Sequence, residues 1–205
     1  MELSLNKNDF INNLTKAFNF VSYQKTRHYL NGVLFEITNN KIIRLVATDG
    51  HKACVIGDTE NIINVVHSAK EKPIERINSE HQFIVSNDMV DKILKNFKLS
   101  NNIDDKVTIT ILADKHLNAI EVSDGSISIK GNIIDGNFPD YVRIIPQFLD
   151  KPNAIFSSNL LISLFKKAKK NKHNPYRFFI TGEKTPSVIT NENMTELFVL
   201  MTAKF

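Results

Sequence analysis

The stretch Thr26-Arg-His-Tyr-Leu-Asn-Gly-Val-Leu-Phe-Glu36 (the first signature), followed by Leu45-Val-Ala-Thr-Asp-Gly-His-Lys52 (the second signature), decides how this chain folds. The amino-acid composition of the chain does not explain so specific a sequence. Its apolar runs at 30–37 and 42–47 predict two strands. Residues 48–51 predict a turn that ends a strand, because aspartate and glycine supply turn geometry. A catalytic role for this tetrapeptide is a much weaker interpretation.

The same order of elements occurs three times along the chain. Each copy has a short apolar strand, then a polar stretch rich in Asn, Asp and Ser, then an amphipathic helix. These polar side chains favour helix starts because their oxygens accept hydrogen bonds from unpaired backbone N–H groups. The expected first strands are 3–5, 83–85 and 154–156, and the expected helices are 10–18, 89–97 and 160–168.

Three further strand-like runs follow each helix. They lie at 30–37, 42–47 and 53–56 in the first copy, at 107–112, 117–122 and 126–134 in the second, and at 176–180, 187–190 and 196–203 in the third. The copies start roughly 70 to 80 residues apart, which is a repeat of supersecondary size. The pattern predicts an α+β fold of repeated βαβββ units, with helices on one face of antiparallel sheets. One unit cannot cover its own sheet, so we expect the units to pair.

Composition and charge set broad limits on the protein. Its 205 residues allow one large domain or two small ones. The formal net charge of +4 is compatible with a nucleic-acid partner but is weak support by itself. The single cysteine, Cys54, permits no internal disulfide, so we expect a reducing compartment and a buried strand residue. Without a signal-peptide pattern or an apolar run near the ~20 residues of a membrane helix, a cytoplasmic protein with no membrane partner is expected.

Motifs for catalysis, cofactors and metals are absent from the sequence. No phosphate-binding loop, dinucleotide fingerprint, nucleophile elbow or zinc motif occurs. The six histidines show no metal-ligand spacing, and His28 and His51 are far apart without nearby acidic residues. We therefore expect a protein that is not an enzyme and that has no catalytic residue, no metal and no cofactor.

A later segment completes a family resemblance. This closing segment is Ile134-Asp-Gly-Asn-Phe-Pro-Asp-Tyr141, with Arg143 and Pro146 after it. Together with the two signatures it resembles the middle domain of the bacterial DNA polymerase III beta subunit family, the sliding clamps. The resemblance is strongest over 26–53 and 134–146. It implies a DNA-clamp fold, in which paired βαβββ units place helices along a central channel and sheets on the outside.

The resemblance also assigns domains. Residues 1–146 resemble one complete clamp domain of two repeats, with a long polar connection at 57–82. Residues 147–205 form a third repeat that resembles the second half of the family's last domain. The family's first domain and the first half of its last domain have no counterpart in this sequence.

Sliding clamps encircle duplex DNA and hold short linear motifs of polymerases and clamp loaders. The resemblance therefore implies a replication or repair processivity factor that binds double-stranded DNA without sequence specificity and binds partner proteins through peptides. If a ring forms, three repeats per chain require four chains to match the twelve repeats of the family ring, so a homo-oligomer is expected. The alternative is an adaptor or decoy that binds clamp-interacting peptides without encircling DNA.

In the family, the peptide pocket lies between the middle domain and the second half of the last domain. Such a site needs an apolar cleft for hydrophobic anchors and a few polar groups that fix direction. Two departures, Ala53 for a larger aliphatic residue and Met201-Thr-Ala-Lys204 for the usual Met-Pro-Met-Arg ending, imply a shallower or differently shaped pocket. The implied pocket residues are Leu30, Thr48, Gly50, His51, Lys52, Ala53, Pro139, Arg143, Ile144, Leu160, Pro186, Val199, Met201 and Lys204.

DNA contacts in the family come from the channel-side helices and from a loop that enters the first signature. By resemblance, that loop supplies Gln24, His28 and Tyr29. Lysines give the diffuse attraction to phosphates that a sliding contact needs. An equally good interpretation is that lysines at a helix end complement its dipole and keep the surface soluble. The lysines in question, near the end of the third helix, are Lys166, Lys167, Lys169, Lys170 and Lys172.

Overall fold

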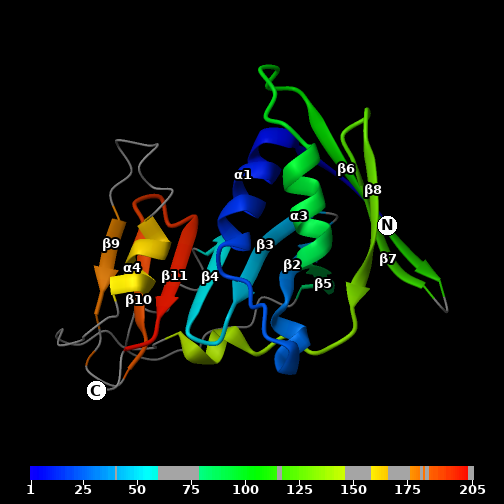
Figure 1. Ribbon diagram of the computed structural model, residues 1–205. Helices are drawn as coiled ribbons and strands as arrows, with labels where there is room; N and C mark the ends of the chain where they lie inside the picture. Colours follow the sequence, from blue (N-terminus) through cyan, green and yellow to red (C-terminus); the bar gives the residue numbers. More distant parts are fainter. Residues whose placement is uncertain are drawn as a thin grey trace. The chain divides into compact units, whose positions relative to one another are not determined.

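The computed structural model describes residues 1–39, 41–59, 79–114, 117–145, 158–165, 176–180, 182 and 185–202. The strands are β1 Glu2–Asn6, β2 Gly32–Thr38, β3 Lys41–Thr48, β4 Lys52–Gly57, β5 His81–Ser86, β6 Lys106–Asp114, β7 Leu117–Ser123, β8 Ser128–Ile134, β9 Tyr176–Phe179, β10 Ser187–Asn191 and β11 Glu196–Leu200. The helices are α1 Lys7–Phe18, α3 Asn87–Asn96 and α4 Ser158–Phe165, with 3-10 helices η1 Lys25–Leu30 and η2 Tyr141–Ile144. This order confirms the α+β class and the repeated strand–helix–strands pattern (Figure 1).

The chain divides into two compact units, which are described separately. The first unit contains Met1–Asp49 and Ser79–Phe138, and the second contains Gly50–Asn78 and Pro139–Phe205. None of the helices in the described segments combines the length and the apolar character needed to cross a membrane.

The helix starts in the first unit follow from the capping residues that the sequence shows. The side chain of Asn6 accepts a hydrogen bond from the Asp9 N–H at 3.0 Å, so α1 begins directly after β1. Ser86 plays the same part for α3, where its hydroxyl accepts from the Met89 N–H at 3.4 Å. The predictions of both helices are confirmed.

The first strand of each repeat in the first unit pairs with the other repeat. Strand β1 pairs with β6, and β5 pairs with β2, in matching registers. Asn6, the N-cap of α1, lies opposite Lys106, the first residue of β6. Ser86, the N-cap of α3, lies opposite Gly32, the first residue of β2. The two repeats are therefore related by an internal pseudo-two-fold and exchange their first strands.

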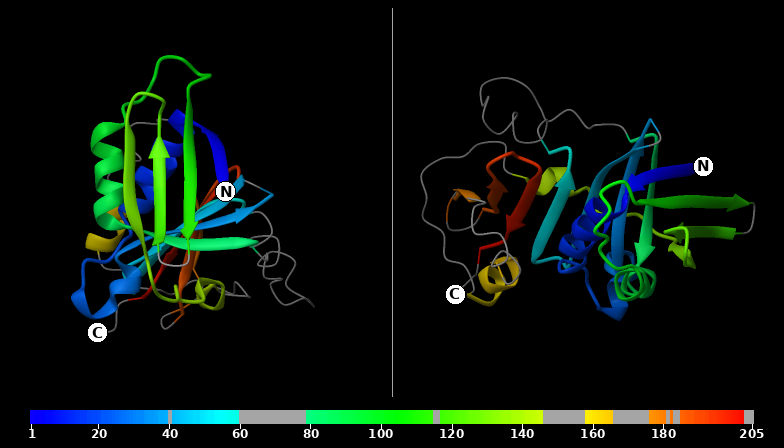
Figure 2. Two further views of the ribbon diagram at one scale, coloured as in Figure 1. Left: turned by 90° about the vertical axis from the view of Figure 1, so that its right-hand side faces the viewer. Right: turned by 90° about the horizontal axis from the view of Figure 1, so that it is seen from above.

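The sheet strands of the first unit follow the order β1-β6-β7-β8-β5-β2-β3. Helices α1 and α3 lie side by side in front of β2 and β3 in Figure 1, and Figure 2 (left) shows β6, β7 and β8 standing next to one another. The core lies between helices and strands: the ring of Phe35 contacts Phe10 edge-on at 6.4 Å and stacks on Phe83 at 5.5 Å. Helix α3 adds Ile93, which is fully buried.

A charged pair is buried across β2 and β3. The Arg44 Nε atom lies 2.6 Å from a carboxylate oxygen of Glu36, and both side chains are almost completely buried. The two residues are cross-strand partners next to a register shift between Glu36 and Ile37. Removing either charge would leave the other buried without this partner, so the pair constrains the β2–β3 hairpin.

The strands of the second unit follow the order β4-β11-β10-β9. Helix α4 lies on one face of these strands (Figures 1 and 2). Strands β4, β10 and β11 are buried along nearly their whole length, and Cys54 is fully buried in β4 as expected. Tyr176 of β9 donates a hydrogen bond from its hydroxyl to the Glu196 carboxylate at 3.0 Å, which ties the edge strand to β11.

Several predicted bounds change. Leu30 ends the 3-10 helix η1 instead of starting β2, because residues 25–30 form local turns before the chain becomes extended. Strand β8 starts at Ser128, since the Asp124 carboxylate holds the N–H groups of residues 126 and 127 in a turn. Strand β11 ends at Leu200 and not at 203. Leu94, predicted as an apolar face residue of its helix, is half-buried.

Some predictions fall on residues outside the described segments. These are the strand at 154–156, the lysines after α4, the domain boundary after residue 146, most of the 57–82 connection, and Lys204.

Candidate partner-binding site

The loop that enters the first signature is held at both ends. The Ser22 N–H donates to the Leu30 carbonyl at 3.0 Å, which closes the loop on itself. The Asn31 amide donates to the Gln24 carbonyl at 3.1 Å. At the start of α3, the Asn87 N–H donates to the Asn31 carbonyl at 2.9 Å and the Asn87 amide donates to the Ser22 carbonyl at 2.7 Å. The loop is thus a defined platform beside α3.

This platform exposes polar and aromatic side chains together. Gln24 and His28 are exposed and Tyr29 is half-buried, so all three predicted DNA-contact residues of the loop lie on one short segment. Tyr23 is 72% exposed, and Lys25 and Arg27 are also exposed. The sequence prediction did not include these last three residues, although Lys25 and Arg27 lie between the predicted positions Gln24 and His28.

The first signature and the closing segment meet at Gly136. A Cβ atom at this position would lie 3.1 Å from the Tyr29 Cβ and 3.6 Å from the His28 Nε2. The rings of His28 and Tyr29 contact each other edge-on at 5.7 Å. Glycine therefore lets the closing segment pack against the loop. This contact is a structural reason why the first signature and the closing segment occur together in one sequence.

The glycines of the two signatures have different structural reasons. At Gly32 a Cβ atom would lie 2.7 Å from the Ile84 Cγ2 atom and closer still to the Val85 carbonyl oxygen, so β5 can approach only a glycine. Gly50 has a φ of 91°, a conformation that other residues rarely adopt, in the turn between β3 and β4. The predicted turn at 48–51 is confirmed.

In the second unit, the structure brings the end of the second signature and the strand β4 that follows it next to the last strand. Ala53 lies opposite Val199, and Lys52 lies opposite Leu200, in the antiparallel β4–β11 pair. The pairing continues past the strand end, where the Met201 N–H donates to the His51 carbonyl at 3.3 Å. Six predicted pocket residues, Gly50, His51, Lys52, Ala53, Val199 and Met201, therefore lie at one end of one strand pair.

These six residues combine a buried base with an exposed rim. Ala53 and Val199 are buried, whereas Gly50 and His51 are exposed and Met201 is 38% exposed. An exposed thioether beside polar groups at a strand end is a surface that a partner's apolar side chain can cover.

The segment around η2 adds further predicted residues in the same unit. Tyr141 and Ile145 are buried and fix the turn, while Pro139 and Arg143 are exposed and Ile144 is 39% exposed. The Arg143 Nε atom lies 3.1 Å from the Asp140 carboxylate. Leu160 and Pro186 are half-buried. The predicted residues Leu30 and Thr48 belong to the first unit, where both are buried.

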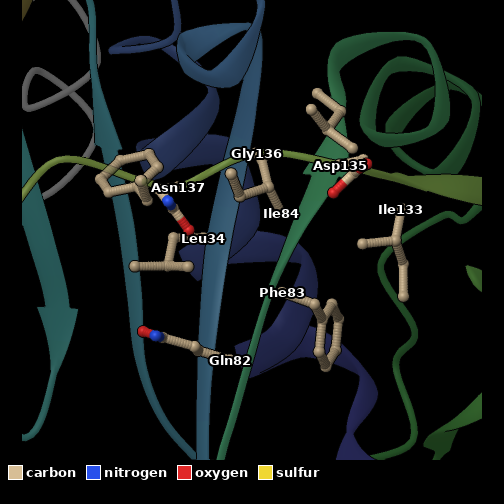
Figure 3. A pocket seen from close by; sticks show the side chains of 10 residues that line it. Leu34, Gln82, Phe83, Ile84, Ile133, Asp135, Gly136 and Asn137 are labelled. Atoms are coloured by element: carbon tan, nitrogen blue, oxygen red, sulfur yellow. The ribbon is translucent and has the colours of Figure 1, made fainter.

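A cavity that the sequence did not predict lies in the first unit, where β5 and β8 diverge (Figure 3). The two strands pair only at Ile84 with Ile134 and at Val85 with Ile133. Next to these pairs, the cavity has a volume of about 470 Å³ and lies between β5, Leu34 of β2 and residues 133–138 at and after the end of β8. Its apolar lining includes Leu34, Phe83, Ile84 and Phe138, and its polar lining includes Gln82, Asp135 and Asn137.

Burial and the neighbouring Glu196 carboxylate raise the pKa of the Tyr176 hydroxyl, so this phenol stays protonated and serves as a hydrogen-bond donor. Within the described residues, no three His, Cys, Asp or Glu side chains gather in a way that could hold a metal ion.

Comparison with known proteins identifies the family. The family described as "DNA polymerase III beta subunit, central domain" matches residues 4–140, which include both signatures and most of the closing segment. The chain belongs to the DNA polymerase III beta subunit family. The described fold of α1, α3 and their strands is therefore the fold of a beta subunit central domain.

Curated relatives and solved structures agree with this family. The "Beta sliding clamp" of Pseudomonas putida is 31% identical over 131 residues, which are 64% of this chain and 30% of the relative. The clamp of Escherichia coli K12 is 30% identical over the same shares. The matched segment is therefore less than a third of these beta subunits.

Among solved structures, the DNA polymerase III subunit beta of Pseudomonas aeruginosa superposes with a TM-score of 0.75 at 16% identity, covering 100% of this chain and 67% of that chain. The sliding clamp of Bartonella birtlesii bound to griselimycin gives a TM-score of 0.71 at 20% identity, covering 100% of this chain and 66% of that one. These structures support the clamp fold along the chain.

Proposed function

We propose that this chain is a sliding-clamp-like processivity factor of DNA replication or repair, which acts by binding and not by catalysis. The family match and the relatives named as sliding clamps support this proposal. The observation that carries it is the strand pair β4–β11, because the second signature and the last strand, which are distant in sequence, present predicted pocket residues together. The predicted cytoplasmic location stays a prediction.

The proposed activity is capture of short linear motifs from polymerases and clamp-loader-type proteins. Exposed apolar side chains, Met201 and Ile144, would receive hydrophobic anchors of an extended peptide. Polar groups at the same strand end, such as His51 and Lys52, would fix its direction. The structure of a related clamp with griselimycin bound supports the idea that this fold holds a ligand.

A peptide titration tests this proposal. We expect a labelled clamp-binding peptide rich in Gln, Leu and Phe to bind the chain, and truncation of residues 201–205 to abolish binding in a fluorescence anisotropy assay. Phe178→Ala is the matched control, because Phe178 is an exposed apolar residue of the edge strand β9 in the same unit. Unchanged affinity after the truncation would refute the assignment.

We further propose that duplex DNA is bound without sequence specificity by the platform at 22–31, as an oligomer that surrounds the DNA. Lys25, Arg27 and His28 offer exposed donors to phosphates, and Gln24 and Tyr29 stand beside them. Retention on nicked circular DNA, with loss after linearisation, is the expected result. Equal retention on linear DNA would argue against encirclement.

A non-encircling adaptor or decoy is the second candidate function. The observation that favours it is the weak charge of the described helix surface: Lys92 and Lys95 of α3 are exposed, but Asp88 is exposed too, and Asp91 lies 2.5 Å from the Lys95 ammonium. A helix surface whose net charge is close to zero attracts phosphates only weakly. Peptide binding without retention on circular DNA would select the adaptor.

A further inference from the structure

The internal repeat makes β8 the counterpart of β4. Each is the last strand of its copy, and each follows a turn of similar sequence, a hydroxyl residue followed by Asp-Gly: Thr48-Asp49-Gly50 before β4 and Ser123-Asp124-Gly125 before β8. The turn glycines have nearly equal φ angles, 91° for Gly50 and 86° for Gly125. The matched registers of the β1–β6 and β5–β2 pairs support the same equivalence.

The two strands differ in what lies along one edge. Strand β4 is paired over residues 52–56 with β11, which is the last strand of the third copy. Strand β8 is paired on one side with β7 over residues 128–132. On its other side it meets β5 only at Ile133 and Ile134, and within the described part of the chain no strand pairs with residues 128–132 there.

Residues 128–132 (the β8 edge) have the makeup of a strand inside a sheet. Ile129 is buried, and a Cβ atom at Gly131 would lie 2.6 Å from the Met89 Sδ atom of α3, so the inner face is already packed. Ser128, Lys130 and Asn132 point to the opposite, exposed face. Such an edge leaves backbone N–H and C=O groups available to another strand.

We propose that the β8 edge pairs antiparallel with the β8 edge of a second copy of this chain, around a two-fold axis at Lys130. The internal pairing rule points to this occupant. Last strands pair with last strands, β4 and β11 already pair with each other, and β8 remains. A strand that pairs with its own copy gives a closed, isologous dimer.

The axis at Lys130 is the register that uses all five residues of the β8 edge. It places Ser128 opposite Asn132 of the second copy and Ile129 opposite its Gly131. The two Lys130 side chains then face each other, which opposes pairing. Each ammonium lies 3.3 Å from the Glu121 carboxylate of its own chain. The two lysines would therefore lie between two carboxylates, which partly offset the repulsion between the ammonium groups.

In this register Asn132, which is exposed, lies diagonally across from Lys130 of the second copy. A positive and a negative charge at position 132 should therefore change the affinity of the dimer in opposite directions. Asn132→Lys should weaken the dimer and Asn132→Glu should tighten it, each by roughly threefold or more in the dissociation constant, since two such contacts form per dimer. Misfolding of a variant cannot explain tightening.

Sedimentation velocity over a concentration series, without DNA or peptide, measures this effect. Asn12→Lys and Asn12→Glu are the matched controls, because Asn12 is an exposed asparagine on α1, away from the β8 edge, and we expect them to match the unaltered chain. A monomer at all concentrations, or equal effects of both Asn132 substitutions, would overturn the proposal.

A cross-link locates the axis. Under mild oxidation, Lys130→Cys should form a disulfide-linked dimer and Asn12→Cys should not, since Cys54 is buried and does not compete. Self-association of the chain without a Lys130→Cys cross-link would mean a different interface and would overturn the proposal. The dimer does not rest on the proposed DNA or peptide binding, so either can fail without the other.

Discussion

At the residue scale, single glycines explain part of the sequence of the signatures and of the closing segment. Gly32 lets β5 approach, Gly50 makes the turn, and Gly136 lets the closing segment contact Tyr29. The glycine at a turn could be predicted from sequence, because Asp-Gly pairs suit turns. The other two could not, since they depend on a strand or loop that is distant in sequence.

The buried Arg44–Glu36 pair predicts an asymmetric response to substitution. Arg44→Met alone should lower the free energy of unfolding by about 3–5 kcal/mol, because a buried carboxylate is left without its partner. The double variant Glu36→Leu/Arg44→Met should recover most of that loss. Chemical denaturation of the three proteins measures both effects, and equal losses for single and double variants would contradict the explanation.

The ion pair between α1 and the turn before β8 predicts a pH-dependent stability. The Lys7 ammonium lies 2.8 Å from the Asp124 carboxylate. Burial alone would raise the pKa of Asp124, but hydrogen bonds from Lys7, Ile127 and Ser126 outweigh it and hold the pKa below its ordinary value. A lowered pKa in the folded state adds stability above about pH 4, and that stability is lost as the pH falls below this value.

Asp124→Asn should therefore be less stable than the unaltered chain at pH 7, with the difference shrinking at pH 3. Asparagine keeps an oxygen for the turn hydrogen bonds, so the substitution removes chiefly the charge. Thermal unfolding at the two pH values checks this, and a difference that is independent of pH would be the contrary result.

At the element scale, helix α3 predicts a contrast between neighbouring residues. Ile93 is fully buried and Leu94 is half-buried. Ile93→Ala should cost about 2–5 kcal/mol, because it opens a cavity in the core, whereas Leu94→Ala should cost clearly less. Denaturant unfolding of both variants is the measurement, and a larger loss at Leu94 would contradict the packing.

The helices of the first unit could be predicted from the sequence, but the pairing of its strands could not. The helices were predictable because Asn6 and Ser86 are capping residues followed by helical periodicity. The exchange of β1 and β5 between repeats was not, since alternation tells which residues face the core but not which strand lies alongside. For the same reason the incomplete β5–β8 pairing, and the cavity beside it, appeared only in three dimensions.

At the scale of the whole molecule, the platform at 22–31 predicts the salt dependence of DNA binding. If Lys25 and Arg27 both contact phosphates, the double variant Lys25→Ala/Arg27→Ala should bind duplex DNA more weakly for every sequence. Its plot of log affinity against log salt should be shallower by about 2. The control is Lys98→Ala, an exposed lysine after α3. An unchanged slope would remove the platform from the DNA contact.

The candidate site was only partly predictable at this scale. Resemblance pointed to the second signature and the last strand, and the β4–β11 register brings these two together. Tyr23, Lys25 and Arg27 were missed because their exposure depends on how Asn31 and Asn87 fix the loop.

We propose that partner peptides bind at the strand end where β4 meets β11. Photo-crosslinking with a clamp-binding peptide that carries a photoreactive phenylalanine, followed by mass spectrometry, tests it most directly. We expect adducts within residues 50–53, 139–144 and 199–201. Adducts confined to the β5–β8 cavity, at Leu34, Phe83 or Phe138, would contradict it.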